Sequence, residues 1–145
     1  MTKFKQALSN NHIFKRLYGI NCDNKKEEQD NLLKVLHLDE KISIVNGSFS
    51  TIDLSNGQRK RLSLLKCYLE NSQIYLFDEW AADQDSEFKK IFYRKLLPEM
   101  KKSGKIVIAI THDDNYFDVA DRIIKMDMGK VAEFKEKEFV NGSIV

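Results

Sequence analysis

The fold is decided by residues 73–79, Gln-Ile-Tyr-Leu-Phe-Asp-Glu, an apolar run that ends in two carboxylates. Such a short apolar run predicts a buried β-strand. A second run at residues 105–110, Lys-Ile-Val-Ile-Ala-Ile, is typical of a parallel strand covered on both faces. A helical pattern at residues 86–96 separates the two runs, and Pro98 should stop or kink that helix because Leu97 before it is disfavoured in the α region. This order of elements predicts an α/β fold with a partly parallel sheet.

Capping boxes and turn dipeptides predict the surrounding elements. Asn24 with Glu27, and Ser55 with Gln58, have the spacing of helix-starting capping boxes. The dipeptides Asn46-Gly47 and Met128-Gly129 predict turns, the first in a loop with short strand pieces and the second in a hairpin. The expected helical stripes are Leu32, Val35 and Leu36 in the first helix, Leu62, Leu65 and Leu69 in the second, and Phe88, Ile91, Phe92 and Leu96 in the helix after the acidic strand end.

The composition is that of one globular domain. The chain has 145 residues, of which 42% are hydrophobic and 32% charged, and its 24 Lys+Arg against 22 Asp+Glu give a net charge of +2. This balance provides no strong field that would favour nucleic acid or an anionic membrane. The longest apolar run, residues 106–110, is far shorter than the roughly 20 residues of a membrane span, and the polar N-terminus is unlike a secretory signal. Cys22 and Cys67 form no CxxC pair, which fits a reducing compartment.

Titratable residues follow both predicted strands. Asp78 and Glu79 end the first strand, and His112 follows the second. Ligands of open parallel sheets lie at the carboxyl ends of the strands, so we expect these three groups to converge on one site. The apolar run that ends in Asp78 and Glu79 resembles the Walker B form of P-loop ATPases, which implies that the Asp holds Mg²⁺ through water and that the Glu orients or deprotonates an attacking water. For this segment alone, the alternative is a strand that runs into an acidic turn.

The segment Leu-Ser-Asn-Gly-Gln at residues 54–58 places a serine cap and a glycine at the start of a predicted helix. The free N–H groups and positive end of a helix favour an anion, and Gly57 lets a phosphate approach the backbone closely. Arg59, Lys60 and Arg61 add positive charge in the first turns. The alternative is a well-capped surface helix with a basic face.

Taken in order, these motifs resemble those of the ATP-binding cassette (ABC) ATPases over about residues 9–135. The sequence Phe-Asp-Glu-Trp-Ala-Ala-Asp-Gln-Asp at residues 77–85 is similar to that of bacterial exporters of cyclic peptides and siderophores, of the syringomycin and pyoverdine type. Residues 10–14 resemble the segment after their Q-loop. The resemblance rests on four motifs, Leu-Ser-Asn-Gly-Gln at 54–58, Tyr-Leu-Phe-Asp-Glu at 75–79, Asp-Gln-Asp at 83–85 and Thr-His-Asp at 111–113.

The resemblance implies a partial P-loop NTPase-like fold of the ABC ATPase type, with a signature helix, parallel strands and a C-terminal hairpin. Residues 1–145 would form one partial nucleotide-binding domain, in which residues 1–71 are the helical signature part and residues 72–145 the sheet part. Its function would be ATP binding and hydrolysis coupled to export of a peptide-like molecule. The implied cofactors are ATP and Mg²⁺. The implied partners are a transmembrane domain and a second copy of the chain, at the cytoplasmic face of a bacterial inner membrane.

The resemblance also implies a role for each site residue. Asp78 matches the Walker B aspartate that holds Mg²⁺, Glu79 the catalytic glutamate, and His112 the switch-loop histidine that contacts the γ-phosphate. Asp85 matches the D-loop aspartate, which crosses the dimer interface. Four residues match the signature motif, which contacts the γ-phosphate of ATP held by the opposite subunit: Ser55, Asn56, Gly57 and Gln58.

Four departures from the family pattern bear on these roles. Asn56 stands where the family more often has Gly, Trp80 replaces a small residue as in the exporter subgroup, and Ser9 occupies roughly the position of the Q-loop glutamine. Ser9 places a direct Mg²⁺ or coupling contact in doubt. The fourth departure is that the sequence contains no Gly-x-x-x-x-Gly-Lys-[Ser/Thr], the P-loop that cradles the phosphates. We therefore expect the chain to be the C-terminal piece of a nucleotide-binding domain and to be inactive alone.

Two other functions remain open at this point. The chain could be the C-terminal lobe of an ABC-type chromosome or DNA-repair ATPase, although the early residues show no sustained heptads and the charge is balanced. It could also be a non-catalytic module that donates only its signature helix to a complete partner. Such a module would need neither Glu79 nor His112.

Overall fold

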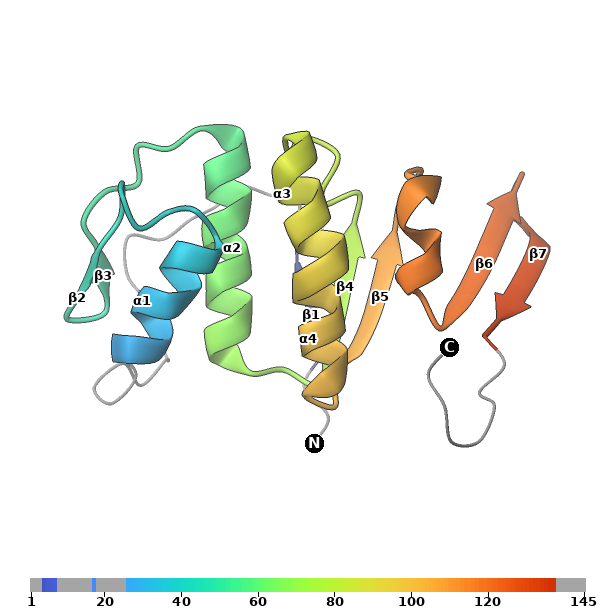
Figure 1. Cartoon of the computed structure of the whole chain (residues 1–145), viewed down its shortest axis with the longest axis horizontal. Coiled ribbons are helices and arrows are strands. Elements are labelled where there is room, and N and C mark those ends of the chain that lie inside the picture. Colours follow the sequence, from blue (N-terminus) through green and yellow to red (C-terminus); the bar gives the residue numbers. More distant parts are fainter. Residues whose placement is uncertain (1–3, 8–16, 18–25, 138–145) are drawn as a thin grey trace. The chain divides into compact units, whose positions relative to one another are not determined.

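The computed structural model describes residues 4–7, 17 and 26–137, which belong to two compact units joined between Thr111 and His112. The first unit has mixed α and β structure, and the second contains a short helix and a hairpin (Figure 1). The elements of the first unit are β1 Phe4–Ala7, α1 Lys26–Val35, β2 Ile44–Val45, β3 Ser48–Phe49, α2 Asn56–Glu70, β4 Ile74–Asp78, α3 Ser86–Ile91, the π-helical stretch η1 Phe92–Leu96, α4 Leu97–Lys102 and β5 Ile106–Ile110. Those of the second are the 3₁₀ helix η2 Asp114–Val119, β6 Arg122–Asp127 and β7 Lys130–Glu136.

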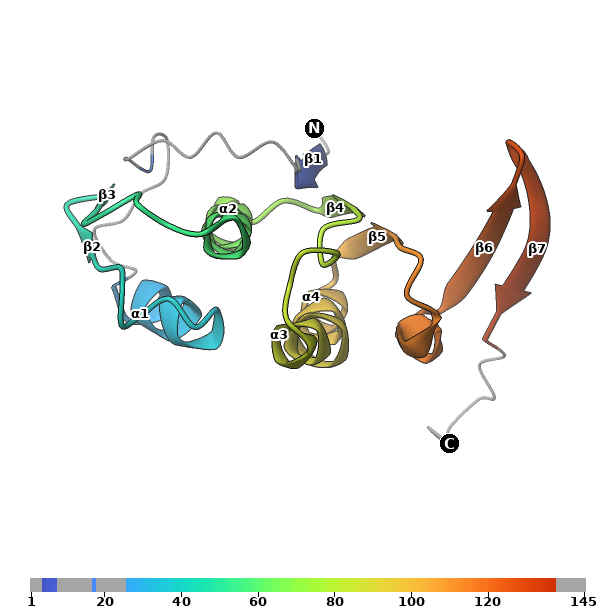
Figure 2. The same cartoon turned by 90° about the horizontal axis from the view of Figure 1, so that it is seen from above.

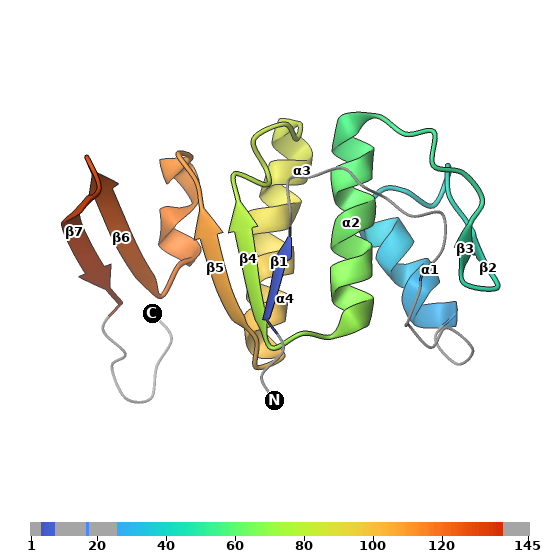
Figure 3. The ribbon, with the colours of Figure 1, turned by 180° about the vertical axis from the view of Figure 1, so that it is seen from behind.

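A parallel sheet in the order β1-β4-β5 forms the centre of the first unit (Figure 3). β4 and β5 start and end level with each other, since Ile74 is opposite Ile106 and Asp78 is opposite Ile110. The predicted α/β class and the two parallel strands are therefore confirmed. Ser9, residues 10–14, Cys22 and the predicted cap at Asn24 lie outside the described residues.

The two faces of this sheet differ in their cover. Tyr75 and Phe77 point to the helical side, where they are 2% and 1% exposed and Phe77 packs 5.2 Å from the ring of Phe92. Figure 2 shows α3 and α4 along this face of β4 and β5. On β5, Ile106, Ile108 and Ile110 are 58%, 47% and 50% exposed. The expectation of a strand covered on both faces is therefore wrong for β5 among the described residues.

The helix after β4 continues through Pro98. Leu97 has φ −63° and ψ −44°, so the expectation that it leaves the α region is wrong. Proline has no N–H and cannot donate to the carbonyl four residues earlier. The stretch η1 adapts to this by a wider turn, in which the N–H of Leu97 donates to the carbonyl of Phe92. Pro98 then occupies the first turn of α4, where no intrahelical donor is required.

Aromatic rings hold α3 and η1 against the end of β4. Trp80 is 2% exposed and stacks on Phe92 with ring centroids 4.5 Å apart, and it also lies 6.2 Å from the rings of Phe77 and Phe88. Phe88, Phe92 and Leu96 are buried, as their helical spacing predicts. The large residue at position 80 is thus part of the core that supports the loop after β4.

The remaining strands form two hairpins with similar turns. β2 and β3 pair around Asn46 and Gly47, and β6 and β7 pair around Met128 and Gly129. All four turn residues have positive φ, between 44° and 75°, as two-residue hairpin turns require. Both turns are as the sequence predicts. Within the described part of the chain, no helix is long and apolar enough to cross a membrane.

Candidate functional site

The start of α2 has the predicted capping box. The Ser55 Oγ accepts a hydrogen bond from the N–H of Gln58 at 3.3 Å, and the Gln58 Oε1 accepts one from the N–H of Ser55 at 3.1 Å. The N–H of Arg59 donates to the Ser55 carbonyl at 2.9 Å and closes the first helical turn. These bonds fix the geometry of the signature-like segment.

The capping bonds leave several donors of this turn unused by the cap. An α-helix provides no internal acceptor for its first N–H groups, and neither capping bond uses those of Asn56 and Gly57. The Ser55 hydroxyl accepts in the cap and retains its hydrogen as a donor, and the Gln58 amide retains its NH₂ group. Asn56 lies in the helix itself and is not among the residues with positive φ, so glycine is not required at its position.

The carboxylates lie at the carboxyl end of β4. Asp78 is the last residue of the strand, and Glu79 follows it with φ 46°, a left-handed conformation that is uncommon for glutamate. The Glu79 N–H donates to the Ile110 carbonyl at 3.0 Å, which ties this turn to the end of β5. Asp78 and Glu79 are both exposed and can reach a ligand at this sheet edge.

Residues 80–85, which we call the acidic loop, connect β4 to α3. Two turns shape the loop, since the Ala82 N–H donates to the Glu79 carbonyl and the Gln84 N–H to the Ala81 carbonyl, each at 3.1 Å. Asp85 ends the loop as the N-cap of α3, where its Oδ1 accepts from the Phe88 N–H at 2.8 Å. This hydrogen bond is the main reason that the pKa of Asp85 lies below its ordinary value, and the Arg61 guanidinium lowers the pKa further.

The basic residues of α2 bind the protein itself. The Lys60 Nζ lies 2.7 Å from the Asp83 carboxylate, and the Arg61 Nη2 lies 2.6 Å from the Asp85 carboxylate. The Arg59 Nε donates to the Leu54 carbonyl at 3.0 Å. Two of the three basic residues therefore hold the acidic loop to α2, and their positive charge is balanced by its carboxylates. The use of this segment as an anion site stays a prediction.

Sequence reasoning missed Tyr93 and did not predict the contacts by which Arg61 and Gln84 shape this region. The Tyr93 hydroxyl donates to the Thr111 Oγ1 at 2.9 Å, which holds the end of β5 against η1. These contacts join residues 18 to 24 positions apart, so no local spacing reveals them. The only local signal in the sequence is the position of Gln84 between Asp83 and Asp85. The structure shows that Gln84 is buried.

The first unit thus brings together most of the predicted site residues. The capped start of α2, the carboxylates that end β4, and Asp85 all belong to it. His112 is the first residue of the second unit and follows Thr111 directly. Among the described residues, no group of three or more His, Cys, Asp or Glu side chains could hold a metal ion. Asp78 is suited to Mg²⁺ with few protein ligands, since this ion commonly takes one or two carboxylates together with water and substrate phosphates.

A family model described as ABC transporter matches residues 2–82, which include the capped start of α2, β4 and the first half of the acidic loop. The chain belongs to the ABC transporter family. The recognised resemblance is thereby confirmed at family level. The match shows the family and assigns no role to a single residue, so the roles of all the site residues stay predictions.

Two relatives show how the chain compares with longer proteins. It is 47% identical over 131 residues to the ATP-binding protein SyrD of Pseudomonas syringae pv. syringae, covering 87% of this chain and 23% of SyrD. It is 28% identical over 102 residues to the ATP-binding protein HrtA of Staphylococcus aureus (strain Newman), covering 70% of this chain and 44% of HrtA. The chain therefore spans about a quarter of one relative and under half of the other.

Solved structures confirm the fold. The dimeric bacterial ABC transporter cassette MJ0796 superimposes with a TM-score of 0.71 at 18% identity, over 95% of this chain and 65% of that one. An Atm1-family ABC exporter with ATP bound gives a TM-score of 0.68 at 20% identity, over 92% of this chain and 25% of the exporter. The predicted partial ABC ATPase fold is confirmed by these similarities.

Proposed function

We propose that the chain is part of the ATP-binding and ATP-hydrolysing component of an ABC exporter that moves a peptide-like molecule across the inner membrane of a bacterium. The observation that carries the proposal is the capped, donor-rich start of α2 in the same unit as the carboxylate end of β4. The 47% identity to the ATP-binding protein SyrD supports the ATP-binding part of this proposal, and the exporter type rests on the sequence resemblance at residues 77–85. The remainder of the nucleotide-binding domain, including the P-loop, would be supplied by residues outside this sequence.

The start of α2 would bind the γ-phosphate of ATP held by a second copy. The N–H groups of Asn56 and Gly57, the Ser55 hydroxyl and the Gln58 amide are all donors, and the helix end adds a positive partial charge. Because the capping box already orders this turn, little conformational entropy is lost when phosphate binds. Because Asp83 and Asp85 balance the charges of Lys60 and Arg61, these oriented dipoles would carry much of the phosphate binding.

The end of β4 would serve ATP bound by the same subunit. Asp78 would hold Mg²⁺, which supplies positive charge to the phosphates when bound. Glu79 would accept a hydrogen bond from the attacking water and take its proton. Its backbone bond to Ile110 holds the turn from which the carboxylate projects. His112, which begins the second unit, would donate to the γ-phosphate as negative charge develops there.

Dimerisation would bring the two kinds of site together. Asp85, at the N-terminus of α3, would lie at the interface between the two copies, next to the signature turn that meets the opposite nucleotide. The dimeric state of the MJ0796 cassette, which has the same fold, supports this arrangement. A transmembrane domain would complete the exporter, and ATP with Mg²⁺ would be its cofactors.

The test is a chimera in which this chain replaces the matching segment of SyrD. We expect the chimera to hydrolyse Mg-ATP, and we expect Glu79→Gln to bind ATP while turnover is nearly abolished. Ser55→Asp should keep the helix cap, because aspartate caps as well as serine, yet its charge should repel the γ-phosphate and abolish hydrolysis. Full hydrolysis by either variant would remove that residue from the mechanism. Salt-dependent binding of DNA by the chain would instead favour a DNA-repair ATPase.

A further inference from the structure

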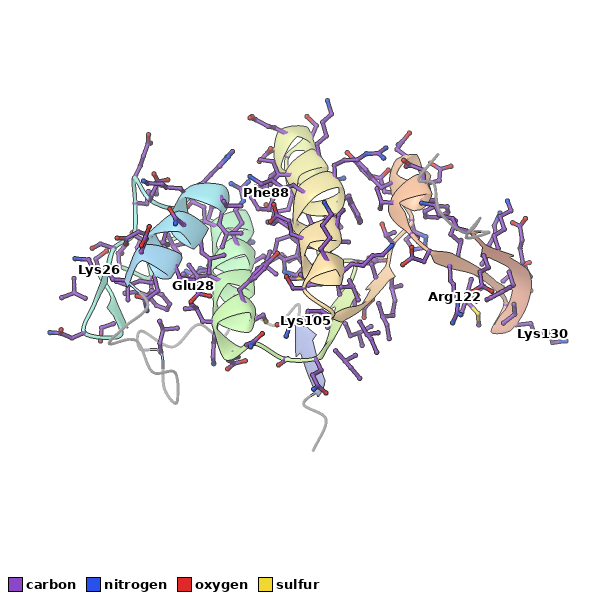
Figure 4. All side chains as sticks on the ribbon, turned by 60° about the horizontal axis from the view of Figure 1, so that its bottom comes forward. Lys26, Glu28, Phe88, Lys105, Arg122 and Lys130 are labelled. Atoms are coloured by element: carbon purple, nitrogen blue, oxygen red, sulfur yellow. The ribbon has the colours of Figure 1, made fainter. Side chains whose placement is uncertain are left out.

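The contacts between α2 and the acidic loop converge on Arg61 and Gln84. The Arg61 Nε donates to the Gln84 Oε1 at 2.9 Å, and its Nη2 donates to the Asp85 Oδ2 at 2.6 Å. Its Cζ also lies 3.9 Å from the ring centroid of Phe88, which is labelled on α3 in Figure 4. The Arg61 side chain is 12% exposed and Gln84 is 6% exposed. The bond between Arg61 and Gln84 is therefore shielded from water, which strengthens it, whereas the Asp85 carboxylate is 59% exposed.

Gln84 extends this contact to the first turn of α2. Its Nε2 donates to the Gly57 carbonyl at 3.2 Å while its Oε1 accepts from Arg61. A Cβ at Gly57 would lie 3.5 Å and 3.6 Å from the two polar atoms of the Gln84 amide, so this amide packs directly on Gly57. Since one end of the amide must accept and the other must donate, its orientation is fixed by both partners.

We propose that Arg61 and Gln84 are positioning residues that hold the first turn of α2 and the acidic loop as one rigid surface. The inference rests on the proposed function, which assigns the opposite subunit's nucleotide to α2 and the dimer interface to Asp85. Both features would then meet the same opposite subunit. A fixed relation between them orders that surface before the subunits meet, which lowers the entropic cost of association and of phosphate contact.

The chemistry of arginine suits this role better than that of lysine. Two nitrogen atoms of one planar guanidinium reach two acceptors, Gln84 and Asp85, while its face covers the ring of Phe88. A lysine ammonium at this position has a single nitrogen and no planar face, so it cannot reproduce all three contacts. Lys60 beside it holds Asp83 and keeps part of the attachment when Arg61 is changed.

The first test is amide hydrogen exchange of the chain with Gln84→Glu. This change keeps an acceptor for Arg61 but removes the donor to the Gly57 carbonyl. We expect the amides of Gln58 and Arg59, which close the first turn of α2, to exchange about two- to tenfold faster, the range for loss of one hydrogen bond. The amides of β4 should be unchanged. Unchanged exchange at Gln58 and Arg59 would overturn the proposal.

A second variant, Arg61→Lys, should loosen both the first turn of α2 and the end of the acidic loop. Exchange should increase at Gln58 and also at Phe88, whose N–H is bonded to Asp85. Arg122→Lys is the matched control, because it makes the same change in the Arg122–Glu136 pair of the hairpin and should leave both amides unaffected. Equal acceleration in β4 would indicate a general loss of stability and contradict a positioning role. No nucleotide is needed, so this test can fail or succeed independently of the ATPase chimera.

Discussion

At the scale of single residues, the backbone of Glu79 is the most informative feature of the site. Its φ of 46° costs a non-glycine residue about 1–2 kcal/mol relative to the right-handed region. The surrounding turn maintains this conformation through the bond from the Glu79 N–H to the Ile110 carbonyl. Backbone strain of this kind is concentrated at functional sites, which agrees with the proposed catalytic role.

A pair of substitutions at Glu79 isolates that strain. Glu79→Gly and Glu79→Ala both remove the carboxylate, but only glycine adopts positive φ without steric cost. We expect the glycine variant to be more stable than the alanine variant by about 1 kcal/mol, measured by urea unfolding. Equal stabilities, or a less stable glycine variant, would show that the turn is not strained.

Gly57 and Gly104 allow the reverse test, in which alanine replaces glycine. A Cβ at Gly57 would make only ordinary van der Waals contacts, and the residue lies in the first turn of α2, so Gly57→Ala should leave stability unchanged or raise it by up to about 1 kcal/mol. Gly104 has φ +74°, so Gly104→Ala should cost about 1 kcal/mol although no atom lies within 4 Å of the added Cβ. Thermal unfolding of both variants checks this. A strongly destabilised Gly57→Ala variant would mean that Gln84 cannot tolerate the methyl group.

At the scale of the elements, α2 and α3 begin with side-chain caps that also shape the site. The Ser55 cap orders the donors of α2, and the Asp85 cap fixes the end of the acidic loop. The same residues therefore stabilise the helices and, in the proposed function, also present groups to a ligand or partner. This dual use explains why both caps lie within motifs that the sequence indicates as functional.

The Asp85 cap predicts a pH-dependent contribution to stability. The pKa of Asp85 is lowered on folding, chiefly by the Phe88 N–H, so its stabilisation is present at neutral pH and is lost as the pH falls through the lowered value. Asp85→Ala should cost about 1 kcal/mol at pH 7, and the difference from wild type should shrink below the usual aspartate value of about 4. Denaturant unfolding at several pH values measures this difference.

Asp113→Ala is the control for this prediction. Asp113 also precedes a helix, η2, but makes no side-chain capping bond to it. Its replacement should cost less at neutral pH. A difference between wild type and Asp85→Ala that grows in acid would contradict the assigned sign of the pKa shift.

At the scale of the whole molecule, the exposed isoleucines of β5 are the main feature. Ile106, Ile108 and Ile110 share one face of a strand in a parallel sheet, a type of sheet that is normally covered on both sides. Contiguous exposed apolar surface favours association. We expect the chain to self-associate with increasing concentration, and Ile108→Lys to reduce this association in sedimentation measurements.

The control for Ile108→Lys uses the other face of the sheet. Phe77→Lys would place a charge in the aromatic core, where the native side chain is 1% exposed, and should unfold the chain. Ile108→Lys should leave the thermal midpoint nearly unchanged because its side chain is half exposed. A strongly destabilised Ile108→Lys variant would show that this face is covered in solution.

The sequence by itself determined the elements and motifs that depend on local chemistry. Apolar runs predicted β4 and β5, the capping box at Ser55 predicted α2, and Met128-Gly129 predicted its hairpin, because strand burial, helix capping and positive φ are set by neighbouring residues. The motif order also identified the family. Pro98 misled the prediction, since the π turn upstream of it satisfies the backbone that proline disrupts.

Only the tertiary structure decided what the charged and polar side chains bind. Arg61, Lys60 and Gln84 find their partners more than 19 positions away, where no periodicity or spacing can indicate them. The structure likewise decided that β5 exposes one face and that Glu79 is held in a left-handed conformation. These features arise when packing brings distant segments together, because ion pairs, burial and backbone strain depend on neighbours in space and not on neighbours in sequence.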